Sequence, residues 1–198
     1  MKILFATRNK GKLAELYQLL GDEDFELIGL DDLADPPEEV EETGSTFAEN
    51  AELKARAAML ATGLPSLADD SGLEVDALDG RPGVFSARYG SSDRDRVERL
   101  LGELDGVPAE ERSARFRCAV VFMHPDEPEA PVLREGSCEG TIIEQPRGHN
   151  GFGYDPVFYV EQIDQTFAEA VPDVKNRLSH RGKAMQQLAE HLHQRYAR

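Results

Sequence analysis

The sequence predicts an α/β protein with a mixed β-sheet flanked by helices. Two observations support this class. Short apolar segments typical of strands alternate with segments in which apolar residues recur at helical spacing, and no internal repeat or low-complexity linker interrupts them. The 198 residues are enough to bury a sizeable core. We therefore expect a single domain over residues 1–198, or two closely merged lobes.

The predicted elements follow one another in a regular order. Strands are expected at 2–6, 25–30, 65–70, 73–78, 115–125 and 156–160, with a hairpin around Glu139 and Gly140. Helices are expected at 11–21, 46–63, 93–106 and 180–196, and an acidic, proline-containing loop at 33–45. The alternation of the strand 115–123 leaves two partly apolar faces, so we expect this strand to contribute to a subunit interface.

The composition restricts the classes of function. Hydrophobic residues make up 40% of the chain and charged residues 30%, as in ordinary globular proteins. No run approaches the ~18 apolar residues of a membrane helix, and the N-terminal "MKILFATRNK" has none of the features of a signal peptide. We therefore expect a cytoplasmic protein. The net charge of −16 argues against nucleic acid as a partner, because binding to its backbone requires a basic face.

The cysteines and lysines narrow the choice of ligands. Cys118 and Cys138 occur in unrelated contexts and are expected to be reduced, buried thiols. No Cys/His cluster is present, so a metal would be held by oxygen ligands, which favours Mg²⁺ or Mn²⁺. Five of the six lysines fall in the segments that other features single out, which suggests a local anion site; they are Lys10, Lys12, Lys54, Lys175 and Lys183.

The turn "ATRNKGKLAEL" (6–16) joins the first strand to the first helix. It carries Arg8, Lys10, Gly11 and Lys12 at the start of the helix. Backbone N–H groups at a helix N-terminus suit a phosphate, and glycine permits a close approach. The segment is not a Walker A loop, and a solvated turn is the alternative.

Lys54 points toward the apolar side of the helix 46–63. At about 100° per residue it lies close to Phe47, whereas Glu49 and Glu52 occupy the opposite side. We expect it either to pair with carboxylates or phosphate, as buried charges usually do, or to extend its ammonium group to water.

Asp69 and Asp70 stand next to each other after an apolar run, in "LADDSG". In an extended segment their side chains point to opposite sides of the sheet. A second acidic source, "EVEETG" (39–44), lies just before the Lys54 helix. One carboxylate from each segment could hold a divalent cation, which would remove the repulsion between the neighbouring charges. The alternative is that the acidic loop is merely solvated.

Two further segments suit an aromatic or anionic ligand. "GHNGFGYDP" (148–156) combines glycines with Phe152 and Tyr154, either of which could stack on a base; a glycine-rich turn before a strand is the alternative. "KNRLSHRGK" (175–183) places His180 among cationic side chains at a helix start, which favours an anion or base pocket.

Taken in order, six segments closely resemble the inosine triphosphate pyrophosphatase family of nucleotide hydrolases. They are "ATRNKGK", "EETGSTFAENAELKA", "LADDSGLEVDAL", "GVFSARYG", "GFGYDPVF" and "SHRGKA", which together span nearly the whole chain. The resemblance implies an elongated mixed sheet, two lobes with the active site in the cleft between them, and a homodimer. It also implies hydrolysis of the deaminated purine triphosphates ITP, dITP and XTP to monophosphate and pyrophosphate with Mg²⁺, for which Mn²⁺ could substitute.

The resemblance assigns roles residue by residue. Glu41 and Asp70 bind the metal and Asp70 accepts the proton; Glu42 stays open as the alternative to Glu41. The phosphates are contacted by Thr7, Arg8, Asn9, Lys10, Gly11 and Lys12. Lys54 is a further substrate-binding candidate because of its position on the helix. The remaining candidates are Ser71, Phe152, Gly153, Tyr154, Asp155, Lys175, His180 and Arg181.

Two other functions remain open on the sequence. A non-catalytic nucleotide sensor would keep the pocket without the chemistry, although the presence of both "DDSG" and "EETG" speaks against it. A related pyrophosphatase could prefer pyrimidine nucleotides. The family substrates share a C6 carbonyl where adenine has an amino group, so donors directed at this position would discriminate against adenine.

Overall fold

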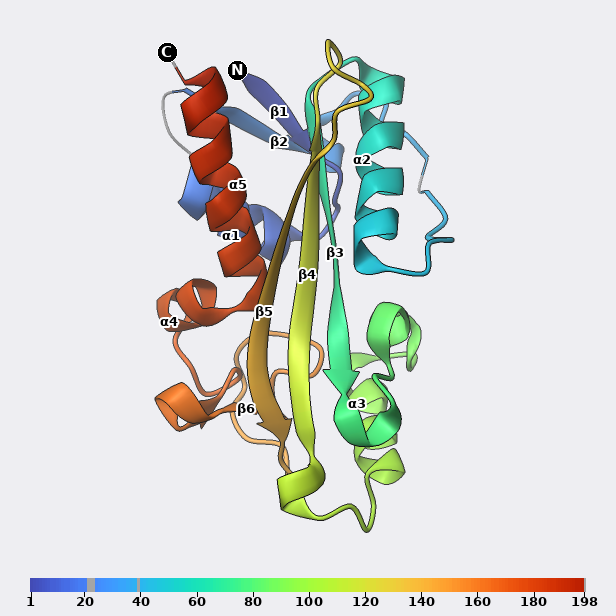
Figure 1. Ribbon diagram of the computed structural model, residues 1–198, viewed down its shortest axis with the longest axis vertical. Coiled ribbons are helices and arrows are strands. Elements are labelled where there is room, and N and C mark those ends of the chain that lie inside the picture. Colours follow the sequence, from blue (N-terminus) through green and yellow to red (C-terminus); the bar gives the residue numbers. More distant parts are fainter. Residues whose placement is uncertain (21–23, 39, 198) are drawn as a thin grey trace. The chain divides into compact units, whose positions relative to one another are not determined.

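The computed structural model of the protein describes residues 1–20, 24–38 and 40–197. In this part of the chain seven strands form one mixed sheet in the order β2-β1-β3-β4-β5-β6-β7 (Figure 1). The strands are β1 (Lys2–Phe5), β2 (Glu26–Gly29), β3 (Ser66–Val75), β4 (Ser113–Met123), β5 (Val132–Ile142), β6 (Phe158–Val160) and β7 (Gln165–Thr166). The helices are α1 (Lys10–Leu20), α2 (Phe47–Thr62), α3 (Asp93–Glu103), α4 (Pro172–Leu178) and α5 (His180–Tyr196). The predicted α/β class is confirmed.

The sheet contains both kinds of strand pairing. β1 pairs in parallel with β2 and with β3, whereas β6 pairs antiparallel with β5 and β7. The chain comprises two compact units. The first consists of Met1–Asp70, Cys118–Gly136 and Arg181–Arg198, and the second of Ser71–Arg117 and Ser137–His180. Among the described helices, none is both long and apolar enough to cross a membrane.

In the first unit, helices cover both faces of the sheet (Figure 1). Side chains alternate along a strand, so Ile3 and Phe5 of β1 share one buried cluster with Leu16 of α1 and Leu188 of α5. Leu4 points to the other face, where it packs with residues that include Ala58 of α2. This alternation places α2, with its inward-facing polar residues, on the face opposite α1 and α5.

Local signals fix the ends of α2, and the predicted helix 46–63 is confirmed. Thr46 is the N-cap, and its side chain accepts a hydrogen bond from the backbone N–H of Glu49. Glu49 in turn accepts one from the backbone N–H of Thr46, which completes a capping box. Gly63 ends the helix in the left-handed conformation that glycine adopts at little cost. The start of α2 is thereby held in one place relative to the preceding loop.

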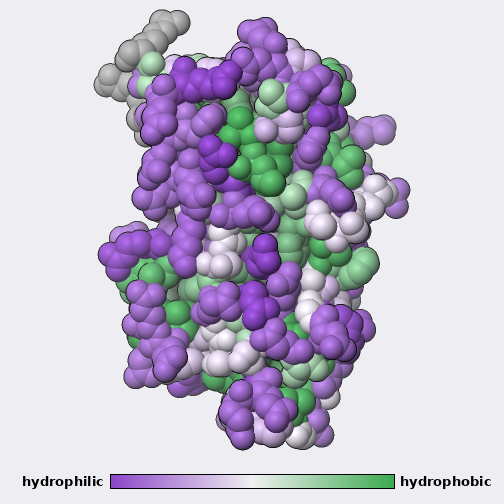
Figure 2. Space-filling model, viewed as in Figure 1, coloured by the Kyte–Doolittle hydropathy of each residue, from purple (hydrophilic) through white to green (hydrophobic). Residues whose placement is uncertain are grey.

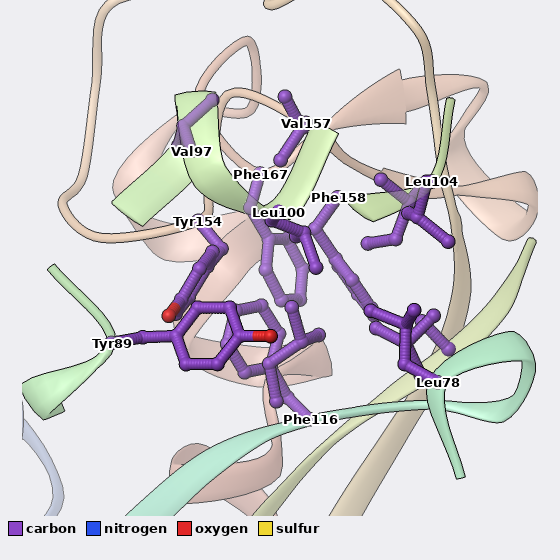
Figure 3. Close-up of a cluster of buried hydrophobic side chains, with 14 of the residues drawn as sticks. Leu78, Tyr89, Val97, Leu100, Leu104, Phe116, Tyr154, Val157, Phe158 and Phe167 are labelled. Atoms are coloured by element: carbon purple, nitrogen blue, oxygen red, sulfur yellow. The ribbon is translucent and has the colours of Figure 1, made fainter. Parts of the chain in front are cut away.

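The second unit has its own apolar core, which is rich in aromatic rings (Figure 3). Leu100 of the largely charged α3 and Leu104, the residue that follows this helix, are fully buried in it. The Phe116 ring of β4 lies 4.6 Å from the Phe158 ring of β6, centroid to centroid. On the outside, Figure 2 shows hydrophilic residues over most of the viewed face, in keeping with the net charge of −16.

Two predictions about strands were wrong. The expected strands 65–70 and 73–78, separated by a Ser-Gly turn, form one continuous strand, β3. The hairpin expected around Glu139 and Gly140 is the interior of β5. A Cβ at Gly140 would lie 2.5 Å from the backbone oxygen of Tyr159, so the glycine permits a close approach of β6 and does not mark a turn.

The strand 115–123 is mostly buried. As part of β4 it lies between β3 and β5, and its residues from Cys118 to Met123 are buried, whereas Arg115 and Arg117 are partly exposed. Its contribution to a subunit interface stays a prediction. The prediction of reduced, buried thiols is confirmed, since Cys118 and Cys138 are free and buried.

The remaining predicted boundaries differ only at the ends. The helix expected at 11–21 is α1, and residue 21 lies outside the described residues. Residue 39 of the acidic loop lies outside them as well. Helix α4 was not predicted; it begins at Pro172, and proline is favoured at the first helical position.

Candidate active site

The turn between β1 and α1 is organised by its own side chains. The side-chain oxygen of Asn9 accepts hydrogen bonds from the backbone N–H groups of Gly11 and Lys12, at 2.9 and 3.2 Å. This bonding starts α1 in the manner of a helix cap. Lys10 is exposed, and Arg8 forms an exposed ion pair with Asp31 at 3.2 Å. The turn therefore presents its cations from a fixed backbone, but two of its N–H donors are already engaged.

Asp69 is the most completely paired carboxylate of the first unit. It is buried in β3, and it accepts hydrogen bonds from the Lys12 Nζ at 2.9 Å and the Arg181 Nε at 3.1 Å. Burial raises the pKa of Asp69, but the surrounding cations lower it by more in sum, so its pKa lies well below the ordinary range. The side chain is therefore a permanent negative charge that holds two cations from α1 and α5.

Asp70 points to the other side of β3, as predicted for an extended segment. Its Oδ1 lies 3.5 Å from the Lys54 Nζ, and this nitrogen also donates to Glu42 at 2.6 Å. The prediction that Lys54 pairs with carboxylates is confirmed. Burial lowers the pKa of Lys54, but the carboxylates around it raise it by more, so the ammonium group is stabilised. Burial also raises the pKa of Asp70 above its ordinary value, more than Lys54 and a hydrogen bond lower it.

The two glutamates of "EETG" lie in different environments. Glu42 is partly buried and contacts Lys54, whereas Glu41 is exposed. Glu42 also contributes to the raised pKa of Asp70, which shows that the two carboxylates interact electrostatically. Of the two alternatives left open by the sequence, Glu42 is the one beside Asp70.

Asn50 is a site residue that the sequence analysis missed. It is fully buried on α2, and its side-chain nitrogen donates to the Asp70 Oδ2 at 3.1 Å. Its side-chain oxygen accepts from the backbone N–H of Gly44 at 2.8 Å. The signal was present in the sequence, because Asn50 precedes Lys54 by four residues and so shares its inward face.

A pocket of about 190 Å³ lies beside these groups in the first unit. Its polar lining includes Thr7, Arg8, Lys12, Glu42, Lys54 and Asp69. The pocket thus brings the turn after β1 together with Lys54 and the acidic loop, as the sequence suggested for an anion site. Arg8 and Lys12 line the pocket at the turn after β1. At Lys54 the neighbouring charged groups are the carboxylates of Glu42 and Asp70.

The carboxylates near Lys54 suit a hard divalent cation. Within the described parts of the chain there is no group of three or more histidine, cysteine, aspartate or glutamate side chains arranged to hold a metal. Mg²⁺ does not need one, because it is commonly held by one or two carboxylates together with substrate phosphates and water. Glu42 and Asp70 already share one cation, the Lys54 ammonium, and their oxygen donors fit this pattern.

The glycine-rich turn forms a second cluster, within the second unit. The buried Asp155 accepts hydrogen bonds from the Lys175 Nζ at 2.6 Å and from the backbone N–H of Phe152 at 2.8 Å. A Cβ at Gly151, which has a positive φ of 75°, would lie 2.0 Å from the Asp155 Oδ2. The Lys175 Nζ also lies 4.8 Å from the centre of the Phe152 ring. The turn is therefore held tightly around one ion pair, and Gly153 is anchored separately by its N–H to Asp93.

The two aromatic candidates of this turn differ in accessibility. The Phe152 side chain is 41% exposed, whereas Tyr154 is buried in the core beside Tyr89 (Figure 3). The Tyr154 hydroxyl donates to the backbone oxygen of Ser86 at 2.9 Å. Phe152 is thus the ring that can stack on a ligand, whereas the buried side chain of Tyr154 anchors the turn to the core.

The other predicted residues fall into separate surroundings. Ser71 follows Asp70 in β3 and is partly buried. The His180 ring stacks on Phe116 in the second unit, at 4.8 Å between centroids. Arg181, the next residue, belongs to the first unit and binds Asp69. The contacts described for Lys175, His180 and Arg181 thus lie in different clusters, and the pocket expected at 175–183 stays a prediction.

Comparison with known proteins assigns the chain to a family. The model of the Ham1 family matches residues 3–191. The chain is 52% identical to the dITP/XTP pyrophosphatase of Geobacillus kaustophilus, over 96% of this chain and 93% of the relative. It is 51% identical to the dITP/XTP pyrophosphatase of Methylococcus capsulatus, over 96% of each.

Solved structures agree with this assignment. A Ham1 protein from Coxiella burnetii matches with a TM-score of 0.90 at 45% identity, over 98% of this chain and 99% of that one. The Ham1 protein of Staphylococcus aureus matches with a TM-score of 0.88 at 40% identity, with the same coverage. The resemblance found in the sequence is thereby confirmed: the chain belongs to the Ham1 family.

Proposed function

We propose that this protein hydrolyses deaminated purine nucleoside triphosphates, namely ITP, dITP and XTP, to the monophosphate and pyrophosphate. One observation carries the proposal: in a Ham1 chain, Lys54 joins Glu42 and Asp70 beside a pocket whose lining includes Arg8, Lys12 and Lys54 together with carboxylates. The relatives from Geobacillus kaustophilus and Methylococcus capsulatus are named for the same activity. The enzyme removes these nucleotides from the cellular pool.

The phosphates are bound by the turn after β1 and its neighbours. A triphosphate is a polyanion, so a chain with a net charge of −16 must present cations locally. Lys12 and Lys54 both line the pocket, and Asp69 fixes the position of Lys12. The residues that contact the phosphates are Thr7, Arg8, Asn9, Lys10, Gly11 and Lys12, with Lys54 beside them and Ser71 next to Asp70.

Asp70 is the proton acceptor. Its raised pKa makes it a stronger base than an ordinary aspartate, and its position beside Lys54 brings it to the substrate's phosphates. Attack of water on phosphorus forms a new P–O bond and breaks the anhydride bond between the α- and β-phosphates, and the proton of the water passes to Asp70. Pyrophosphate leaves with the electrons of the broken bond.

Glu42 and Asp70 would hold a divalent cation. When bound, Mg²⁺ supplies charge neutralisation at the phosphate oxygens and lowers the pKa of water. Mn²⁺, which also prefers oxygen ligands, can substitute. Glu42 takes the role that the family resemblance gave to Glu41, because Glu42 is the partly buried glutamate beside Asp70 whereas Glu41 is exposed.

The base is contacted by the glycine-rich turn of the second unit. Phe152 offers an exposed ring for stacking, and Gly153, Asp155 and Lys175 fix the turn that carries it. A donor from the same unit, Lys175 or His180, suits the C6 carbonyl of hypoxanthine and xanthine. Adenine would bring an amino group to the same place, and the unpaired buried donors would cost about 1–3 kcal/mol each.

A panel of nucleotides tests the function. We expect kcat/KM for dITP, ITP and XTP to exceed the values for dATP and dTTP about 10²-fold or more, because a hydrogen-bonding site strongly rejects a mismatched group. Products are resolved by ion-exchange chromatography with excess Mg²⁺. Faster turnover of dTTP would show a pyrimidine enzyme, and tight binding of dITP without pyrophosphate release would show a nucleotide sensor.

Replacing Asp70 tests its role as the base. We expect Asp70→Asn to lower kcat about 10²–10⁴-fold, the usual contribution of acid–base catalysis, while dITP still binds. Steady-state kinetics and isothermal titration calorimetry measure the two quantities. Asp105→Asn, which makes the same change at an exposed position, should leave both unchanged. Turnover near that of the wild type in Asp70→Asn would remove Asp70 from the mechanism.

The two glutamates provide a matched pair for the metal site. We expect Glu42→Gln to raise the Mg²⁺ concentration needed for half-maximal activity about tenfold or more, because a carboxylate ligand is lost. Glu41→Gln makes the same chemical change on the neighbouring, exposed side chain and should have little effect. Activity is measured across an Mg²⁺ titration. The opposite pattern would assign the ligand to Glu41.

The assembly and location inferred from the sequence stay predictions. We expect a homodimer, as the family resemblance implies, and the part of β4 with the partly exposed Arg115 and Arg117 is the candidate contribution of this strand to the interface. Sedimentation velocity at micromolar concentration measures the mass, and a monomer would rule the dimer out. A single domain of two merged lobes, a cytoplasmic location and the lack of a nucleic-acid partner rest on length, composition and charge alone.

A further inference from the structure

Asn50 connects the acidic loop and the strand that carry the candidate metal ligands. The amide is fully buried, and both of its ends are used. Its oxygen accepts from the backbone N–H of Gly44, two residues after Glu42, and its nitrogen donates to the carboxylate of Asp70. Gly44 precedes Asn50 by 6 residues and Asp70 follows it by 20. A single side chain thus determines how the acidic loop meets β3.

The chemistry of the bridge allows one orientation of the amide. Gly44 offers an N–H donor and Asp70 offers carboxylate acceptors, so a rotated amide would place nitrogen against N–H and oxygen against oxygen. Both mismatches would be buried, where unpaired polar groups cost about 1–3 kcal/mol. Asn50 therefore does more than fill space, because it fixes the direction of the Asp70 carboxyl group.

Gly44 is part of the same arrangement. A Cβ at this position would lie 2.6 Å from the Asn50 side-chain oxygen and 2.7 Å from the Cβ of Glu49. Only glycine leaves room for its backbone to approach the start of α2 so closely. The capping box of Thr46 and Glu49 holds the adjoining residues. The loop is thus attached to α2 at consecutive points, and Asn50 extends this attachment to the catalytic strand.

The contacts divide the two oxygens of Asp70 between different partners. Oδ2 accepts from Asn50 at 3.1 Å, whereas Oδ1 faces the Lys54 Nζ at 3.5 Å. Asn50 and Lys54 lie four residues apart, about one turn of α2, so they project from the same face of the helix. The helix therefore fixes the distance between the partners of the two Asp70 oxygens. With Oδ2 occupied by the amide, Oδ1 is the atom directed toward Lys54 and Glu42.

We infer that Asn50 is a positioning residue for the reaction. It directs the Asp70 Oδ1 toward Lys54 and Glu42, where the cation and the attacking water would be bound. It also holds the loop that carries Glu42 in a fixed position relative to Asp70. This inference rests on the proposed function for the identity of the reaction, but the bridge itself can be tested without substrate. A purely structural Asn50 would affect stability alone. A positioning Asn50 affects kcat beyond any effect on stability, because a small misplacement of a reacting group is costly.

Two variants of Asn50 separate its two bonds. Asn50→Leu removes both with little change in volume, whereas Asn50→Asp keeps an oxygen for the Gly44 N–H and loses the donor to Asp70. We expect kcat for dITP with saturating Mg²⁺ to fall about 10²-fold in both variants, with a much smaller change in KM. Amide hydrogen exchange at Gly44, measured without Mg²⁺ or substrate, should accelerate in Asn50→Leu and not in Asn50→Asp.

The matched control is Met59→Ala. Met59 is buried on the same helix and makes the apolar contacts of a core residue, so its truncation lowers the melting temperature without touching the bridge. We expect Met59→Ala to keep the kcat of the wild type at a temperature where it is folded. A kcat within about twofold of the wild type in Asn50→Asp, or an equal loss in Met59→Ala, would overturn the positioning role.

A double-mutant cycle tests the bond apart from catalysis. In Asn50→Asp combined with Asp70→Asn, the amide and the carboxylate exchange places and the hydrogen bond can form again. We expect the loss of melting temperature in the double variant to be smaller than the sum of the two single losses. Simple additivity would show that the bond contributes nothing and would overturn the inference. An inactive wild-type protein would instead refute the proposed function and leave this stability result standing.

Discussion

The burial of two adjacent aspartates in one strand is the constraint around which the first unit is organised. Taking a carboxylate out of water costs several kcal/mol unless cations and hydrogen bonds replace the water. Here the cations come from three helices: Lys12 from α1, Lys54 from α2 and Arg181 from α5. Each helix packs on the sheet by its apolar residues, but the pairing with the aspartates determines where its polar end lies.

The strand geometry gives the two neighbours different chemistry. Because Asp69 and Asp70 point to opposite sides of β3, one lies between two cations and the other shares Lys54 with Glu42. The pKa of Asp69 is lowered and that of Asp70 is raised. Pairs of carboxyl groups with opposite shifts are typical of sites that divide structural and catalytic roles. Asp69 is suited to hold the phosphate-binding cations, and Asp70 to take part in proton transfer.

The sequence was informative where the periodicity of the side chains gave the signal. Helical periodicity predicted that Lys54 faces inward, and strand alternation predicted that the two aspartates point to opposite sides of the sheet. It could not show which cation meets which aspartate, because Lys12 and Arg181 lie 57 and 112 residues from Asp69. Such partners are set by the packing of whole elements. The choice between Glu41 and Glu42 was likewise beyond local reasoning, since it depends on the path of a loop around α2.

Glycine was the least reliable local signal. Gly140 suggested a turn because glycine is frequent in turns, yet here it makes room for the backbone of β6. Gly44 and Gly151 serve the same purpose at the two clusters, where Asn50 and Asp155 occupy the space of a side chain. In this chain several glycines thus occupy positions where a neighbouring group leaves no room for a side chain, and the sequence alone does not identify that group.

The placement of Cys118 has a consequence for chemical durability. Burial raises the pKa of this thiol, and the negative charge of Asp69 raises it further. Because the thiolate is the form that reacts with peroxides and electrophiles, this buried sulfur atom is kept in its inert form. The packing of β4 that completes the core therefore also protects the protein from oxidative inactivation at this position.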